Sequence, residues 1–126
     1  MSQTVIQTEK APAAIGPYVQ ARKVGPFLYT SGQIPLDAAT GEMPATIEEQ
    51  ARLALANVEA ILAAAGLGKE HVFKTTVFVK DLNDFATVNG IYEAFFGDHK
   101  PARSCVEVAR LPKDALVEIE AIAYGE

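Results

Sequence analysis

The chain has 126 residues, of which 49% are hydrophobic and 21% are charged, and this composition is typical of one globular domain with a single core. The formal net charge of −5 argues against a nucleic-acid-binding surface, which needs clustered Lys and Arg to neutralise phosphates. No run of about 20 apolar residues is present, so the sequence contains no candidate membrane span.

The single cysteine, Cys105, makes an intrachain disulfide impossible and favours a reducing compartment, the cytoplasm. The first ten residues contain no basic start followed by an apolar block, so we expect no secretory signal. His71 and His99 are far apart in the sequence, and no Gly-rich phosphate-binding motif occurs. We therefore expect neither a metal nor a cofactor.

The first half of the chain is divided into short elements by Gly and Pro. Two strands are predicted at 17–23 and 27–34, with Gly25 and Pro26 in the turn between them. The clearest helix is predicted over 47–65, where apolar residues repeat at helical spacing.

The ends of this helix carry their own signals. Thr46 and Glu49 have the spacing of a capping box at its start, and Gly66 can adopt the left-handed conformation that ends a helix. A strand rich in Val, Thr and Phe is predicted next, at 72–80.

A second helix is predicted at 84–96, with Asp84 as its cap and Gly97 at its end. Four aromatic residues are assigned to the core: Phe73, Phe78, Phe85 and Phe95. Two last strands are predicted at 103–109 and 116–124. The order ββαβαββ predicts an α+β fold for residues 1–126, a single domain with a mixed sheet and both helices on one face.

The last two strands alternate charged and apolar residues. Arg103 and Cys105 point to one side of the first strand and Val106 to the other, and Glu118 and Glu120 share one side of the second. If these strands form a hairpin, joining apolar face to apolar face places Arg103 and Cys105 on one surface with both glutamates.

Two interpretations of that surface stay open. Composition alone favours a cross-strand ion pair on a solvated sheet face, which would contribute little to stability. Alternatively, Arg103 holds a ligand carboxylate in a bidentate fork while a nearby carboxylate positions or deprotonates water. Because helices would cover only one face of the sheet, apolar residues such as Tyr29 and Tyr124 on the other face predict an oligomer with sites between chains.

Several motifs, spread in order over essentially the whole chain, carry a family resemblance. They are Ala14-Ile15-Gly16-Pro17-Tyr18, Thr30-Ser31-Gly32-Gln33-Ile34-Pro35, Lys74-Thr75-Thr76-Val77-Phe78-Val79, Asp84-Phe85-Ala86-Thr87-Val88-Asn89, Pro101-Ala102-Arg103-Ser104-Cys105-Val106, Val108-Ala109-Arg110-Leu111-Pro112 and Glu118-Ile119-Glu120-Ala121. Together they resemble the Rid family, also known as the YjgF or reactive intermediate deaminase family. The block holding Arg103 and Cys105 resembles the RidA branch, in which that arginine marks imine deaminase activity.

The resemblance implies a chorismate-mutase-like fold and a homotrimer, in which three sheets form a central barrel and three clefts lie between subunits. It implies hydrolysis of 2-iminobutanoate and 2-iminopropanoate to 2-oxo acids and ammonia. These imines form from the enamines released by pyridoxal-phosphate-dependent dehydratases, and their removal protects other pyridoxal-phosphate enzymes.

The resemblance also implies roles for individual residues. Arg103 would bind the substrate carboxylate, the backbone of Cys105 would contact the imine nitrogen, and Glu118 would hold the attacking water. The other positions that would line the pocket are Tyr18, Ser31, Gly32 and Asn89. Glu120 is expected to be structural. A protonated imine is already electrophilic, so orientation of substrate and water can supply most of the acceleration without a covalent nucleophile.

One segment departs from the family pattern. The segment 97–100 is a few residues shorter than in close relatives and lacks their aromatic residue before Pro101. We therefore expect a changed rim beside Arg103 and a changed substrate preference. Two other functions stay open. One is a non-catalytic trimer that binds small carboxylates as a regulator. The other is a ribonuclease or translation inhibitor, which the net charge of −5 disfavours.

Overall fold

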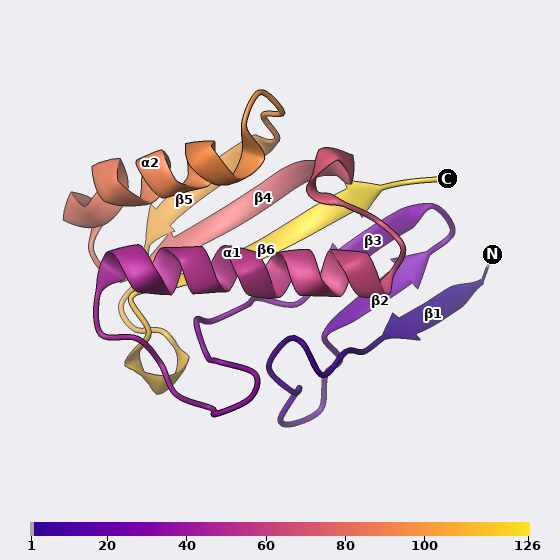
Figure 1. Ribbon diagram of the computed structural model, residues 1–126, viewed down its shortest axis with the longest axis horizontal. Coiled ribbons are helices and arrows are strands. Elements are labelled where there is room, and N and C mark those ends of the chain that lie inside the picture. The colour runs from indigo at the N-terminus through magenta and orange to yellow at the C-terminus, as the bar shows by residue number, and fades with distance from the viewer. Residues whose placement is uncertain (1) are drawn as a thin grey trace.

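Six strands and two helices build residues 2–126, the part of the chain that the computed structural model describes. The strands are β1 (Gln3–Ile6), β2 (Ala21–Val24), β3 (Phe27–Thr30), β4 (Val72–Val79), β5 (Ala102–Glu107) and β6 (Val117–Tyr124). The helices are α1 (Ile47–Ala64) and α2 (Phe85–Phe96), and both cover the same face of the sheet (Figure 1). The mixed sheet with two helices on one face is therefore confirmed, whereas β1 was not predicted.

The caps of α1 largely follow the prediction. The Thr46 hydroxyl accepts a hydrogen bond from the backbone N–H of Glu49 at 3.2 Å and donates to the Glu49 carboxylate at 3.1 Å. Gly66 ends the helix with a φ of +77°, where glycine has no steric penalty. The start of α2 differs, because Asp84 makes no side-chain cap. Instead, Asp81 accepts from the backbone N–H of Asn83 in the turn before the helix.

The sheet order is β1-β2-β3-β6-β4-β5, and only β4 and β5 run parallel. The predicted hairpin between the last two strands is wrong, because β4 lies between them. The chain crosses over from β4 through α2 into β5, and β6 then returns antiparallel between β3 and β4. This topology makes β5 an edge strand.

The same topology changes which side chains share a face. Arg103 lies level with Thr75 on β4, and Cys105 lies level with Val77. Thr75 and Val77 are buried beneath the helices, so Arg103 and Cys105 also face the helix layer. Glu118 is paired with Phe78 on the opposite face, so the expectation that Arg103 shares a surface with Glu118 and Glu120 is wrong.

The core lies between the helices and the sheet. Its fully buried side chains include Leu28, Leu55, Ile61, Leu62, Val72, Val77 and Ile119. The other face of the sheet carries exposed apolar side chains, among them Val5, Tyr29, Val106 and Tyr124. Neither helix within residues 2–126 is long and apolar enough to cross a membrane.

Three of the four phenylalanines assigned to the core are wrong. Phe78 is only half-buried and lies on the face without helices, level with Glu118. Phe73 is 44% exposed and Phe85 is 37% exposed. Phe73 packs edge-on against Phe27 beside Tyr124, on the face without helices. Phe85 lies at the start of α2, close to the Arg103 guanidinium.

Candidate active site

Arg103 projects from the edge strand β5 to a helix whose side chains surround its guanidinium. Its Nη1 donates a hydrogen bond to Oδ1 of Asn89 at 2.6 Å. The central guanidinium carbon lies 4.8 Å from the ring centroid of Tyr92 and 5.4 Å from that of Phe85. Phe85, Asn89 and Tyr92 are spaced four and three residues apart on α2, which places them on one side of the helix.

The positive charge of Arg103 has no acidic partner within residues 2–126. Among these residues Arg110 forms an ion pair with Asp114, and Nδ1 of His71 lies 3.7 Å from the Glu70 carboxylate. The cross-strand ion pair that composition favoured is therefore absent. Only Nη1 of Arg103 has a hydrogen-bond partner among the described residues, so Nε and Nη2 remain available for the two oxygens of a carboxylate.

A hollow of about 670 Å³ adjoins this guanidinium. It is lined by Asn89, Tyr92 and Arg103, and on its other side by Gly97, His99, Lys100 and Pro101. The segment expected to shape the rim beside Arg103 therefore does line the hollow.

Cys105 lies two residues beyond Arg103 on the same face, where its side chain is half-buried against the core. Burial raises the pKa of its thiol, an effect that the Arg103 charge partly offsets. A thiol with a raised pKa is a poor nucleophile at neutral pH. The Cys105 thiol is therefore not expected to act as a nucleophile.

Glu118 is on β6, where its carboxyl group lies against Gly32. A Cβ added at Gly32 would overlap Oε2 of Glu118, so the close approach needs glycine at this position. Gln33 and Ile119 hold the two segments together with backbone hydrogen bonds of 2.8 and 3.1 Å. Burial raises the pKa of Glu118, and the neighbouring charge of Glu120 raises it further.

Ser31 and Tyr18 lie near the same glycine. The Ser31 hydroxyl donates to the backbone oxygen of Val19 at 2.6 Å. Tyr18 is 52% exposed, and its ring lines a small hollow of about 280 Å³ that Gly32 also lines. Its hydroxyl accepts a hydrogen bond from the backbone N–H of Ile15 at 3.4 Å.

The seven predicted site residues therefore form two groups. The arginine group consists of Asn89, Arg103 and Cys105, and the glutamate group consists of Tyr18, Ser31, Gly32 and Glu118. Arg103 and Glu118 lie on opposite faces of the sheet. The arginine group is suited to holding a carboxylate, and the glutamate group presents a carboxyl group that can bind and deprotonate water.

The sequence did not single out Tyr92 and Thr75 as neighbours of the site. The hydroxyl groups of these two residues form a hydrogen bond of 2.6 Å, and the Tyr92 ring lies against Arg103. The spacing of Phe85, Asn89 and Tyr92 on one side of a helix is a signal that could have suggested a common partner.

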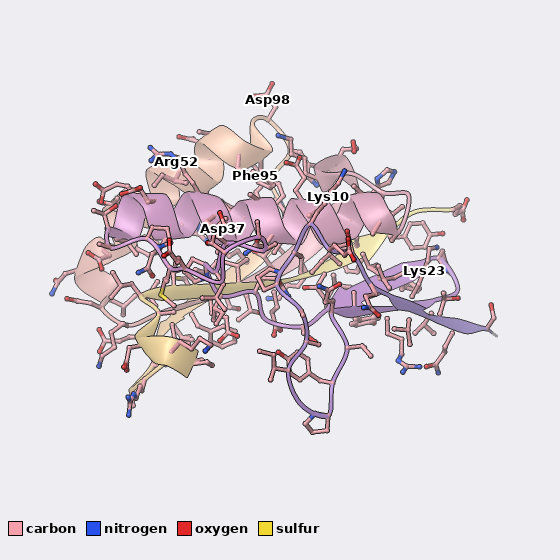
Figure 2. The ribbon with its side chains drawn as sticks, turned by 60° about the horizontal axis from the view of Figure 1, so that its bottom comes forward. Lys10, Lys23, Asp37, Arg52, Phe95 and Asp98 are labelled. Carbon is pink, nitrogen blue, oxygen red and sulfur yellow. The ribbon has the colours of Figure 1, made fainter. Side chains whose placement is uncertain are left out.

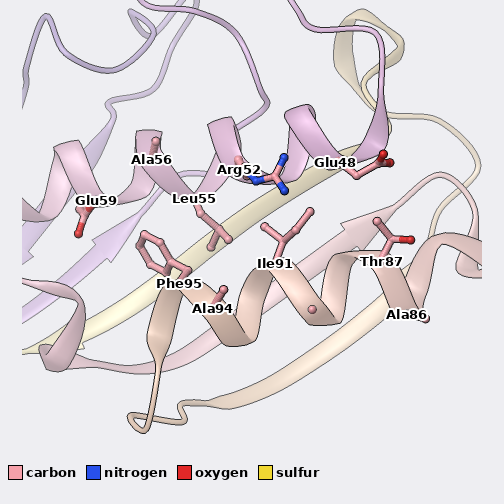
Figure 3. Close-up of a pocket in the computed structure, with 11 residues that line it drawn as sticks. Glu48, Arg52, Leu55, Ala56, Glu59, Ala86, Thr87, Ile91, Ala94 and Phe95 are labelled. Carbon is pink, nitrogen blue, oxygen red and sulfur yellow. The ribbon is translucent and has the colours of Figure 1, made fainter.

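A third hollow is separate from both groups. It is a groove of about 640 Å³ between α1 and α2, lined by Leu55 and Ala56 on α1 and by Ile91 and Phe95 on α2; the Leu55 side chain points toward α2 (Figure 3). Arg52 and Phe95 lie in the helix layer, on the side of the sheet that the helices cover (Figure 2). None of the predicted site residues lines this groove.

Comparison with known proteins agrees with the motifs of the sequence. The family model described as endoribonuclease L-PSP matches residues 8–125. The 2-iminobutanoate/2-iminopropanoate deaminase of Escherichia coli K12 is 65% identical, with 98% of each chain covered.

Solved structures agree in fold. The crystal structure of E. coli TdcF with bound serine has a TM-score of 0.95 at 56% identity, and covers 98% of this chain and 99% of its own. The YjgF gene product from E. coli has a TM-score of 0.93 at 63% identity, and the match covers 96% of this chain and 98% of that one. The chain therefore belongs to the endoribonuclease L-PSP family, the Rid or YjgF family that its motifs resemble.

Proposed function

We propose that this protein hydrolyses 2-iminobutanoate and 2-iminopropanoate to 2-oxo acids and ammonia, and so removes reactive imines that inactivate pyridoxal-phosphate enzymes. The observation that carries the proposal is the half-buried guanidinium of Arg103, which has no acidic partner within residues 2–126 and adjoins a hollow. The 65% identity to a relative named for this activity supports the substrate class.

In this reaction Arg103 binds the substrate carboxylate through Nε and Nη2, which places the adjacent imine carbon at a fixed distance from the protein. The backbone of Cys105 contacts the imine nitrogen. This role suits an edge strand such as β5, because alternate backbone groups there have no neighbouring strand. Tyr18, Ser31, Gly32 and Asn89 complete the pocket.

Glu118 holds the attacking water and accepts its proton as the oxygen bonds to the imine carbon. The electron pair of the C=N bond moves to nitrogen and forms a tetrahedral carbinolamine. Glu118 then returns the proton to the amine. As the C–N bond breaks, the hydroxyl oxygen forms the carbonyl and gives its proton back to Glu118, and the 2-oxo acid and ammonia are released. Its raised pKa suits a group that both accepts and donates a proton.

The proposal includes a homotrimer with a central barrel and sites between subunits, located in the cytoplasm. Within one chain the arginine group and the glutamate group are on opposite faces of the sheet, so a second subunit is needed to bring one group to the other. The exposed apolar residues Tyr29 and Tyr124 on the face without helices supply a surface for assembly.

The test is the replacement of Arg103 by alanine, assayed with threonine dehydratase as the source of fresh 2-iminobutanoate. We expect the accelerated release of ammonia to fall by about 100-fold or more, because the substrate carboxylate loses its charged partner. Arg52→Ala removes an exposed arginine from α1 outside the site and should keep full activity. Undiminished release by Arg103→Ala would contradict the assignment.

Two alternatives give different results with the same protein. A regulatory trimer would bind small carboxylates through Arg103 without accelerating ammonia release. The description of the matched family names an endoribonuclease, so RNA cleavage is the second alternative. It would be supported by purified protein that cleaves RNA and loses this activity on Glu118→Gln.

A further inference from the structure

Tyr92 lies against the Arg103 guanidinium and is held at its far end by Thr75. Its ring centroid is 4.8 Å from the guanidinium carbon, and its hydroxyl is 2.6 Å from Oγ1 of Thr75. We infer that Tyr92, anchored by Thr75, is a positioning residue that sets the orientation of the Arg103 fork toward the substrate carboxylate. This inference rests on the proposed function.

The anchor is rigid because both partners are buried. Thr75 is 1% exposed and Tyr92 is 8% exposed. Thr75 is also the β4 residue that lies level with Arg103 in the parallel pairing. The three residues are therefore connected in a ring of contacts. Arg103 lies beside Thr75 through the pairing of β5 with β4, Thr75 forms a hydrogen bond with Tyr92, and the Tyr92 ring packs against the Arg103 guanidinium.

A planar guanidinium needs two kinds of contact to fix its orientation. The Tyr92 ring, with Phe85 near it, restricts the position of the cation, and Asn89 accepts a hydrogen bond from Nη1. Together these contacts leave Nε and Nη2 available for the substrate. If the Tyr92 ring loses its anchor at Thr75, Phe85 and the hydrogen bond to Asn89 remain, but the fork is held less firmly at one angle.

Tyr92→Phe keeps the ring and removes the anchor. We expect the KM for 2-iminobutanoate to rise about fivefold, a size consistent with a weakened cation–π contact, while kcat changes by less than about twofold. The effect falls on KM because the fork grips the carboxylate, which does not change during the reaction, whereas Glu118 orients the water separately. Thr75→Val removes the same hydrogen bond from the other side and should raise KM by a similar factor.

A double variant separates positioning from folding. Each single change leaves one buried hydroxyl without a partner, which lowers the melting temperature. Thr75→Val combined with Tyr92→Phe removes both hydroxyls, so its melting temperature should return close to that of the wild type. A positioning role predicts that KM stays raised in the double variant. Recovery of KM together with the melting temperature would overturn the inference.

The same assay distinguishes failure of this inference from failure of the proposed function. Wild-type protein that does not accelerate ammonia release overturns the proposed function. Wild-type turnover that is lost in Arg103→Ala, combined with a wild-type KM in Tyr92→Phe, leaves the function intact and overturns the role of Tyr92 alone.

Discussion

Glu118 combines a half-buried position with a nearby negative charge, and both raise its pKa. The ionised form is the one that can accept a proton from water, so we expect kcat/KM to fall as the pH drops through this raised pKa. Glu120→Gln removes the neighbouring charge and should move the acidic limb of the pH profile to lower pH, with activity at neutral pH retained. A limb that stays in place or moves to higher pH would contradict this assignment.

The raised pKa of Glu118 also predicts the direction in which the stability of the fold changes with pH. The folded protein binds the Glu118 proton more tightly than the unfolded chain does, so the contribution of this group to stability falls as the pH rises from the ordinary glutamate pKa through the raised one. At neutral pH Glu118 is therefore expected to lower the free energy of unfolding. Such a cost is typical of a residue that is kept for its chemistry.

A substitution at Gly32 tests the close contact between this residue and the Glu118 carboxyl group. In Gly32→Ala the new Cβ would overlap Oε2 of Glu118, so the carboxyl group must move. We expect turnover of 2-iminobutanoate to fall by about 10-fold or more, since displacement of a catalytic group by about 1 Å carries a cost of that order or larger. Circular dichroism should show a native fold. Full activity would mean that the position of Glu118 is not critical.

At the scale of elements, Gly90 within α2 and Gly97 at its end should respond in opposite ways to replacement by alanine. A Cβ at Gly90 meets nothing within 4 Å, so Gly90→Ala should stabilise the protein by about 0.5–1 kcal/mol through helix propensity. Gly97 ends the helix at a φ of +65°, so Gly97→Ala should destabilise it by about 1 kcal/mol. Urea unfolding of both variants checks the pair, and equal effects would contradict this account.

The elements that the sequence predicts best are those with local signals. The capping hydroxyl of Thr46 and the glycines that end both helices were found because each acts within a few residues of the chain. The strand β1 was missed because three of its four residues are exposed, which leaves no alternation of apolar and polar residues.

The pairing of β5 could not be read from its pattern. Alternation correctly separates Arg103 and Cys105 from Val106, but it does not say which side meets the core. The apolar Val106 indicated the core side, yet it is 42% exposed on the opposite face of an edge strand. The family motifs identified Arg103 and Glu118 as site residues. They could not show that the two residues lie on opposite faces of the sheet, because this depends on the order of strands that are far apart in the sequence.

At the scale of the whole molecule, sites between subunits make a distinct prediction about mixed assemblies. Arg103→Ala lacks one group and Glu118→Gln lacks the other, so each assembly alone should be nearly inactive. Coexpressed subunits should recover part of the wild-type turnover, because some interfaces then combine an intact arginine group with an intact glutamate group. Mixing the two purified proteins without subunit exchange is the control. No recovery in coexpressed assemblies would place both groups of each site in one subunit.

The placement of the arginine group and the glutamate group on opposite faces has a consequence for newly synthesised protein. A freshly folded monomer would carry both groups and still be unable to present them to one substrate molecule. Specific activity would then depend on protein concentration and would fall on dilution below the assembly threshold. Activity would begin only when enough chains are present to associate, so the rate of synthesis would control when imine removal starts.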